Sequence, residues 1–260
     1  MDYQFISLET VGRVLKLSLH RPSTNALNRA FGEELFAVFQ EVAQLEDVSV
    51  VVITSALDKA FIAGADIKEM AAMDQAESES FSRLLQETYS LLPRMKKVVI
   101  AAINGHALGG GCELALACDF RFMTRGKALI GLPEAGLGIV PGAGGTQRLP
   151  RLVGLSKALD MLLGGRALGP EEALAIGLVD RLFDAETFAA EVMDFATTLA
   201  SGAGKALGFI KASVHEGLEL PMDQALAVER KYGLENLLTR DAKEGLKAFS
   251  EKRKPNFTNK

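Results

Sequence analysis

Two acidic residues, Glu113 and Glu134, stand in stretches of the sequence that otherwise contain few charges. Glu113 comes two residues after a run of three glycines, and Glu134 is the only ionisable residue between Lys127 and Arg148. Two carboxylates that share one site can move protons to and from a substrate, one as acid and the other as base. Beside a group that binds a carbonyl oxygen, they are the parts needed to add or remove water next to that carbonyl.

The glycine run indicates where a carbonyl oxygen would bind. An apolar stretch, Val98–Ile103, is followed by Gly109, Gly110 and Gly111 and then by a helical pattern over 111–117. Without Cβ atoms, the backbone N–H groups at the start of this helix can reach a ligand, and the helix dipole adds partial positive charge. The site suits a phosphate or a developing oxyanion. It is neither a P-loop, because no Gly-Lys-Ser/Thr follows, nor G-x-G-x-x-G.

Each of these features also has an ordinary structural interpretation. Glu113 could be an acid that the helix dipole favours in a first turn. Glu134 could face solvent from an apolar loop. The segment 61–68, in which Gly64 permits an unusual backbone angle, could be a plain turn between a strand and a helix. The patterns by themselves leave these alternatives open.

The elements that must position these residues alternate between strand and helix. Strands are expected over 5–8, 13–19, 48–54, 98–103 and 120–123, and helices after Asn28, over 67–72 with Asp66 as N-cap, over 74–92 ending at Pro93, and over 111–117. Loops are expected over 55–65 and 131–145, and His106, which precedes the glycine run, is interpreted as a polar loop residue. The alternation continues to about Phe183, and only helical patterns follow from Ala185. This order predicts an α/β fold with a helical C-terminal region.

Composition excludes several classes of function. The 260 residues carry 29 Lys and Arg against 33 Asp and Glu, a net charge of −4, which argues against a broad nucleic-acid surface. Cys112 and Cys118 provide neither a disulfide framework nor a zinc site, so a reducing compartment and no metal are expected. The N-terminus lacks a signal-peptide pattern, and the longest uncharged run falls short of the ~18 apolar residues of a membrane helix. We therefore predict a cytoplasmic protein without a membrane segment, a mature organellar form remaining possible.

Four blocks of the sequence, in order, resemble those of a known family. They are Ala60–Met70, Ile100–Phe120, Pro133-Glu134 and Pro141–Leu149, and the stretch Phe249–Pro255 is similar to the family's ending. The resemblance is to the enoyl-CoA hydratase/isomerase family, also called crotonases, and it spans essentially the whole chain.

The resemblance implies a fold and an assembly. The fold would be a spiral of ββα turns with two sheets over residues 1–195, followed by a C-terminal helical oligomerisation region over residues 196–260. The assembly would be a homotrimer or a dimer of trimers. The substrate would be an acyl-CoA thioester, and no separate cofactor is expected because coenzyme A is part of the substrate.

The resemblance also implies residue roles. The N–H groups of Ala65 and Gly110 would form an oxyanion hole for the thioester carbonyl, and Glu113 and Glu134 match the two catalytic glutamates of the hydratases. Having both acids favours reversible syn addition of water to a trans-2-enoyl-CoA, in fatty-acid or related acyl-CoA degradation. In that scheme Glu134 transfers a proton at Cα, and Glu113 activates the water that attacks Cβ.

Further residues would contact the substrate's CoA part. They are Asn25, Ala26, Leu27, Ala63, Gly64, Asp66, Ile67, Lys68, Gly109, Phe249 and Lys252. Of these, Phe249 and Lys252 would come from a neighbouring subunit and, with Lys68, meet the adenine or the phosphates.

Two other functions stay as alternatives. A Δ3,Δ2-enoyl-CoA isomerase would use the same oxyanion hole, with Glu134 as the proton shuttle. An RNA-binding role on the same fold would need a basic helix, but residues 28–47 contain five acids, Glu33, Glu34, Glu41, Glu46 and Asp47, beside Arg29. No nucleic-acid partner is therefore expected.

Overall fold

A six-stranded sheet forms the centre of the protein, whose computed structural model describes residues 3–260. Its strands are β1 (Ile6–Val11), β2 (Val14–Leu19), β3 (Val50–Ser55), β5 (Val98–Ile103), β7 (Phe120–Thr124) and β10 (Arg181–Phe183). They lie in the order β1-β2-β3-β5-β7-β10. The pair β1 and β2 is antiparallel, and the other neighbours are parallel.

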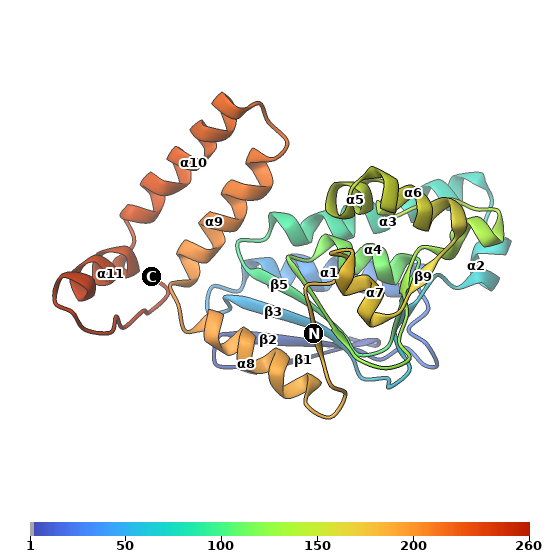
Figure 1. Ribbon diagram of the computed structural model, residues 1–260, viewed down its shortest axis with the longest axis horizontal. Helices are drawn as coiled ribbons and strands as arrows, with labels where there is room; N and C mark the ends of the chain where they lie inside the picture. Colours follow the sequence, from blue (N-terminus) through green and yellow to red (C-terminus); the bar gives the residue numbers. More distant parts are fainter. Residues whose placement is uncertain (1–2) are drawn as a thin grey trace.

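The continuous apolar runs of the central strands arise because both faces of this sheet are covered. Along β3, Val50 and Val52 face a small cluster with helix α8 (Phe188–Ala200), whereas Val51 and Ile53 face the main core. Helices α1 (Arg29–Gln44), α3 (Gln75–Arg94) and α4 (Gly110–Ala117) lie on the main-core side, opposite α8 (Figure 1). Strand β5 is buried along its whole length.

A second sheet of four short strands lies beside the first. Its members are β4 (Ala60–Ala63), β6 (His106–Leu108), β8 (Ile130–Gly131) and β9 (Ala167–Leu168), in that order. Each of β4, β6 and β8 follows a strand of the large sheet, namely β3, β5 and β7. Successive turns of chain thus add one strand to each sheet, which is the expected ββα spiral.

Three local predictions were wrong. The segment 55–65 is not all loop, because Ala60–Ala63 forms β4, and His106 begins β6 and is not a loop residue. Both strands are too short to show a period of two, and they form because they pair with each other across the spiral. Helix α3 also continues past Pro93 to Arg94, since a proline in the last turn removes only one backbone donor.

Side chains cap the N-termini of three core helices. Asn28 accepts a hydrogen bond from Phe31 N, and Asp66 accepts one from Glu69 N, as predicted for both. Asp74 forms a reciprocal capping box with Glu77. The remaining core elements are α2 (Ile67–Ala72), the 3₁₀ helix η1 (Pro133–Leu137), α5 (Gly145–Val153), α6 (Leu155–Gly164) and α7 (Pro170–Ala175).

The C-terminal part is helical, as predicted, and it extends away from the layered core. Helices α9 (Gly204–Gly217), α10 (Met222–Leu237) and α11 (Arg240–Ser250) make up this arm (Figure 1). The predicted boundary at residue 195 falls inside α8, which still packs on the large sheet through Ala196 and Ala200. The division into residues 1–195 and 196–260 stays a prediction.

Candidate active site

A cavity of about 350 Å³ lies where the small sheet meets α3, α4 and η1. Nine of the residues that the sequence analysis selected line it: Leu27, Ala63, Gly64, Ala65, Ile67, Gly109, Gly110, Glu113 and Glu134. These residues come from four separate stretches of chain, which the spiral brings to one place. Both glutamates therefore open onto the same space as the two predicted oxyanion amides.

The glycine turn between β6 and α4 places backbone in direct contact with its neighbours. Gly109 has a φ of +52°, in the left-handed region that favours glycine. A Cβ on Gly110 would lie 2.4 Å from Leu27 Cδ1, and one on Gly111 would lie 2.2 Å from the carbonyl oxygen of Ile62. The absence of side chains thus lets the start of α4 sit against β4.

The N–H groups of Ala65 and Gly110 are available to a ligand, because neither donates to any protein acceptor among residues 3–260. Hydrogen bonds to neighbouring backbone groups fix the peptides that carry these two N–H groups. Leu27 N donates to Gly64 O at 2.8 Å, and Asp66 N donates to Leu27 O at 2.7 Å. In the peptide of the Gly110 N–H, Gly109 O accepts a hydrogen bond from Glu113 N at 3.0 Å, and the buried Tyr89 hydroxyl donates to the next carbonyl, Gly110 O, at 3.0 Å. Fixed donors of this kind suit an oxygen that gains negative charge.

Glu113 is buried and held by backbone donors. Its Oε1 accepts hydrogen bonds from Ala143 N and from Gly145 N, each at 2.8 Å. Burial raises the pKa of Glu113, and these two N–H groups and the charge of Arg148 oppose that rise. An amide N–H can only donate, so this arrangement favours the ionised carboxylate, the form that accepts a proton.

Glu134 has the opposite surroundings. Its Oε2 is buried and finds no hydrogen-bond partner within residues 3–260. Its Oε1 lies over the glycine turn, 2.9 Å from where a Gly109 Cβ would stand. Burial, with a smaller contribution from the negative charge of Glu113, raises the pKa of Glu134 to about 7. Near neutral pH this carboxyl group can both hold and release a proton.

Comparison with known proteins assigns the chain to a family. The profile of the enoyl-CoA hydratase/isomerase family matches residues 9–260. A crotonyl-CoA hydratase of Syntrophomonas wolfei is 42% identical over 265 residues, covering 100% of both chains. A short-chain-enoyl-CoA hydratase of Clostridium acetobutylicum is 39% identical, covering 98% of this chain and 97% of its own.

The chain belongs to the enoyl-CoA hydratase/isomerase family.

A solved structure agrees with this membership. The enoyl-CoA hydratase of Geobacillus kaustophilus HTA426 superposes with a TM-score of 0.98 at 38% identity, over 100% of this chain and 98% of that one. The spiral fold inferred from the resemblance is therefore the fold of the enoyl-CoA hydratase/isomerase family in this chain.

Several predicted CoA contacts of this family member lie outside the cavity lining. Asn25 is fully buried, and its side-chain amide donates to Ser55 Oγ and Phe61 O. Asp66 caps α2 and pairs with Arg21 at 3.0 Å. These two side chains hold the Ala65 segment in place, a role that the sequence analysis did not assign to Asn25.

The remaining predicted contacts are Ala26, Lys68, Phe249 and Lys252. Ala26 is partly buried, and its carbonyl accepts a hydrogen bond from Arg21. Lys68 is exposed on α2, whereas Phe249, 86% exposed, and Lys252 lie on the C-terminal arm. Within this single chain the arm residues do not line the cavity. Their predicted contact through a neighbouring subunit stays a prediction.

Sequence reasoning missed one wall of the cavity. Phe81 and Leu85 of α3 line it, together with Met70 and Met73 at α2. The spacing of Phe81 and Leu85 indicates an apolar helix face, but it does not say what that face covers. Ala143 was inside a recognised block, yet its contact with Glu113 had no local signal.

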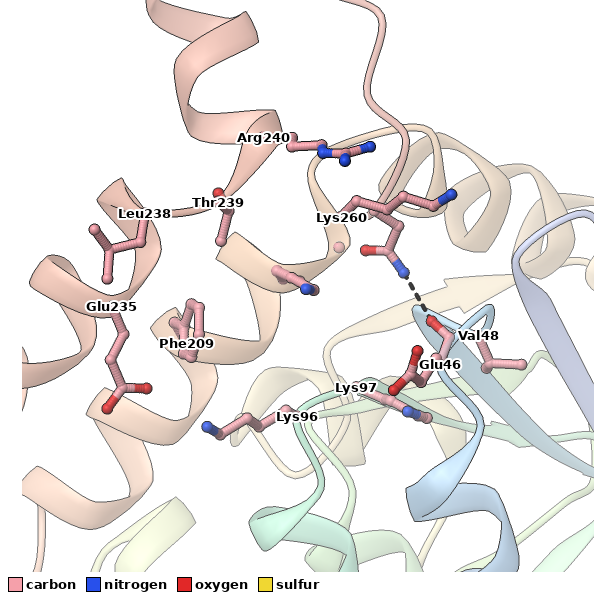
Figure 2. A pocket seen from close by; sticks show the side chains of 13 residues that line it. Glu46, Val48, Lys96, Lys97, Phe209, Glu235, Leu238, Thr239, Arg240 and Lys260 are labelled. Atoms are coloured by element: carbon pink, nitrogen blue, oxygen red, sulfur yellow. Dashed lines mark hydrogen bonds between the residues drawn. The ribbon is translucent and has the colours of Figure 1, made fainter.

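A larger cavity, of about 610 Å³, lies between the core and the arm. Figure 2 shows its mixed lining, with Glu46 beside Lys97 and with Lys96 near Phe209. The Nζ of Lys96 lies 4.7 Å from the centre of the Phe209 ring. Glu113 and Glu134 do not line this larger cavity. The candidate active site is therefore the smaller cavity, which both glutamates line.

Two features are absent from residues 3–260. No group of three or more His, Cys, Asp or Glu side chains is placed to hold a metal ion in that part of the chain. No helix in it is both long and apolar enough to cross a membrane.

Proposed function

We propose that this protein is an enoyl-CoA hydratase, which adds water reversibly and syn to a trans-2-enoyl-CoA and gives a 3-hydroxyacyl-CoA. One observation carries the proposal. Buried Glu113, bound by N–H donors, and half-buried Glu134, whose Oε2 has no partner within residues 3–260, line one cavity with two backbone N–H groups that are free in the same part of the chain. The names of the relatives, crotonyl-CoA hydratase and short-chain-enoyl-CoA hydratase, support the same reaction and favour a short acyl chain.

The two amides would bind the thioester carbonyl. When a nucleophile adds to Cβ of an enoyl thioester, negative charge moves to the carbonyl oxygen. The N–H groups of Ala65 and Gly110 stabilise this enolate as it forms, and the helix dipole of α4 adds to their effect. Coenzyme A enters as part of the substrate, so the proposal requires no separate cofactor.

The glutamates move the protons. Glu113, in its ionised form, takes one proton from water as the water oxygen bonds to Cβ. Glu134, in its protonated form, gives its proton to Cα, and the π electrons of the double bond complete the new C–H bond. The proton that Glu113 gained must then return to Glu134. The reactive form of the pair therefore carries one proton in both directions of the reaction.

We also propose that the protein assembles through its arm into a homotrimer or a dimer of trimers. On α9 the exposed apolar residues Ile210, Val214 and Leu218 follow each other at intervals of four, so they form one stripe along the helix. Further large apolar side chains are exposed on α10 and α11, among them Met222, Leu238 and Phe249. A contiguous apolar surface of this kind is typical of an interface.

Hydration of crotonyl-CoA by the Gln variants tests the proposed reaction. Gln is close to Glu in shape, so Glu134→Gln and Glu113→Gln should keep the fold, checked by circular dichroism, and bind the substrate. Each should lower hydration by at least about 10²–10⁴-fold, the usual contribution of general acid–base transfer. Longer 2-enoyl thioesters assayed beside crotonyl-CoA would measure the chain-length preference.

The isomerase alternative gives a different pattern. Moving a double bond from position 3 to position 2 needs one proton shuttle and no held water. Near-normal hydration by Glu113→Gln, with conversion of a 3-enoyl-CoA lost only in Glu134→Gln, would assign the protein to the isomerase branch and overturn the hydratase proposal.

A further inference from the structure

Arg148, in the first turn of α5, reaches back to the loop that binds Glu113. Its Nη1 donates to Ala143 O at 2.8 Å, and its Nη2 donates to Ser90 Oγ of α3 at 3.3 Å. The peptide that this carbonyl forms with Gly144 lies between the two residues, Ala143 and Gly145, whose N–H groups bind Glu113. The guanidinium therefore holds the carbonyl of a residue whose N–H contacts the proposed catalytic carboxylate.

The backbone leaves room for this guanidinium. Gly144 lies between the two donor residues, with a φ of +111°, and a Cβ on it would stand 2.1 Å from Arg148 Nη1. Any side chain at position 144 would thus occupy the place of the guanidinium. The turn lets Ala143 N and Gly145 N converge on the same oxygen, Glu113 Oε1.

The charge of Arg148 is not neutralised locally. No carboxylate of residues 3–260 lies within ion-pairing distance of its guanidinium, and burial lowers its pKa while the negative charge of Glu113 raises it. Three other titratable groups act near Glu113, namely Tyr89, Cys112 and Glu134. Burial raises the pKa values of Tyr89 and Cys112, which keeps both neutral. Arg148 is therefore the cation whose charge acts on Glu113.

We propose that Arg148 is a positioning residue for hydration, which fixes the Ala143 carbonyl so that the N–H groups on either side of Gly144 converge on Glu113, and whose charge favours the Glu113 carboxylate. This inference rests on the proposed hydratase function. Arg148 does not itself line the cavity, and it touches the lining only through the carbonyl of Ala143. It acts through Glu113, which must be ionised to take a proton from water.

Two substitutions separate the contact from the charge. Arg148→Gln keeps a neutral donor and loses the charge, whereas Arg148→Lys keeps the charge and loses the two-pronged geometry. Arg151→Gln is the matched control, because Arg151 is an exposed cation of the same helix whose Nη1 donates to Gln147 O at 2.8 Å, away from the loop that binds Glu113. Each variant is assayed with crotonyl-CoA across the pH range.

The expected result is a change in kcat and in pH dependence. Arg148→Gln should lower kcat by about tenfold to a hundredfold, as small misplacements of reacting groups do, with KM nearly unchanged. Without the cation, the Glu113 carboxylate is less stable relative to its protonated form. The acid limb of the profile, where kcat/KM falls as pH is lowered, should therefore move to higher pH. Arg148→Lys should lower kcat and leave that limb in place, and Arg151→Gln should change neither kcat nor the limb.

Other results would overturn the proposal. A folded Arg148→Gln protein with the parent's kcat and acid limb, or one in which only KM changes, excludes the positioning role. If Arg148→Gln does not fold, Arg148→Lys provides the test. A shift of the acid limb of its kcat/KM profile would then also exclude the proposed role of Arg148.

A direct titration keeps this test independent of the proposed reaction. Infrared difference spectra between the parent and Glu113→Gln report the ionisation of Glu113. The Glu113 titration should move to higher pH in the Arg148→Gln background whichever reaction the protein catalyses, and an unmoved titration counts against Arg148. Absence of hydration in the parent protein would count against the proposed function alone.

Discussion

At the scale of single residues, the two glutamates differ in what surrounds the same functional group. Glu113 accepts two backbone N–H bonds, whereas Glu134 Oε2 is buried without a partner among residues 3–260. Unpaired burial disfavours the charged form and so costs stability at neutral pH. A group of this kind is retained where its proton is used.

This cost predicts how Glu134→Gln changes stability with pH. The pKa of Glu134 rises from 4.5 in the unfolded chain to about 7 in the folded one. Below pH 4.5 the carboxyl group is protonated in both the folded and the unfolded chain, so its raised pKa does not change the free energy of unfolding. As pH rises from 4.5 towards 7, the free energy of unfolding falls progressively. Glu134→Gln should therefore have little effect at pH near 4.5 and should raise the free energy of unfolding by about 1–3 kcal/mol above pH 7.

Urea unfolding of the parent and the variant at several pH values checks this stability prediction. The gain should grow with pH and then level off. A gain of equal size at every pH would mean that the ionisation of Glu134 is not its cause.

At the scale of elements, the site depends on how closely α4 approaches its neighbours. Gly110 faces the side-chain end of Leu27, and Gly111 faces the backbone of Ile62 in β4. A side chain can rotate away from an added methyl group, but a paired strand cannot. The two neighbouring glycines should therefore tolerate alanine differently.

We expect Gly111→Ala to destabilise the protein by about 1–3 kcal/mol, as overpacking usually does, and Gly110→Ala to do so by less. Gly136→Ala is the control, because nothing lies within 4 Å of the added atom. Chemical unfolding of the three variants measures the differences. Equal losses at Gly110 and Gly111 would show that the strand backbone does not limit the approach of α4.

At the scale of the whole molecule, a buried ion pair fixes the arm to the core. Lys211 of α9 pairs with Asp119 at 2.8 Å, and its Nζ also donates to Leu92 O and Lys97 O. Asp119 in turn accepts a hydrogen bond from Val99 N of β5. Because these groups are buried, the orientation of α9 is set with respect to the central sheet.

That orientation leaves the α9 stripe exposed, and Leu218, at 77%, is its most exposed member. We expect Leu218→Glu to shift the assembled protein towards monomers, since a charge at the centre of an apolar interface is costly. Val11→Glu, on the exposed end of β1, is the control and should keep the parent's mass. Light scattering at micromolar concentration measures both, and a monomeric parent would contradict the assembly proposal.

Local chemistry made much of the fold predictable. The strand over 98–103, the glycine turn and the helix after it could be read from the sequence, because apolar periodicity and missing Cβ atoms act within a few residues. The caps Asn28 and Asp66 were predictable for the same reason. The resemblance of four blocks to a family then placed the glutamates and the oxyanion amides together.

Tertiary structure alone decided the rest. Strand β4 exists because it pairs with β6, about 45 residues later in the chain, an interaction that no local pattern carries. The contacts of Ala143 and Gly145 with Glu113, 30 and 32 residues apart, depend on how the spiral stacks its turns. The sequence by itself determined which residues could do the chemistry. Their burial and their donors, and hence which glutamate keeps its proton, follow from contacts between distant segments.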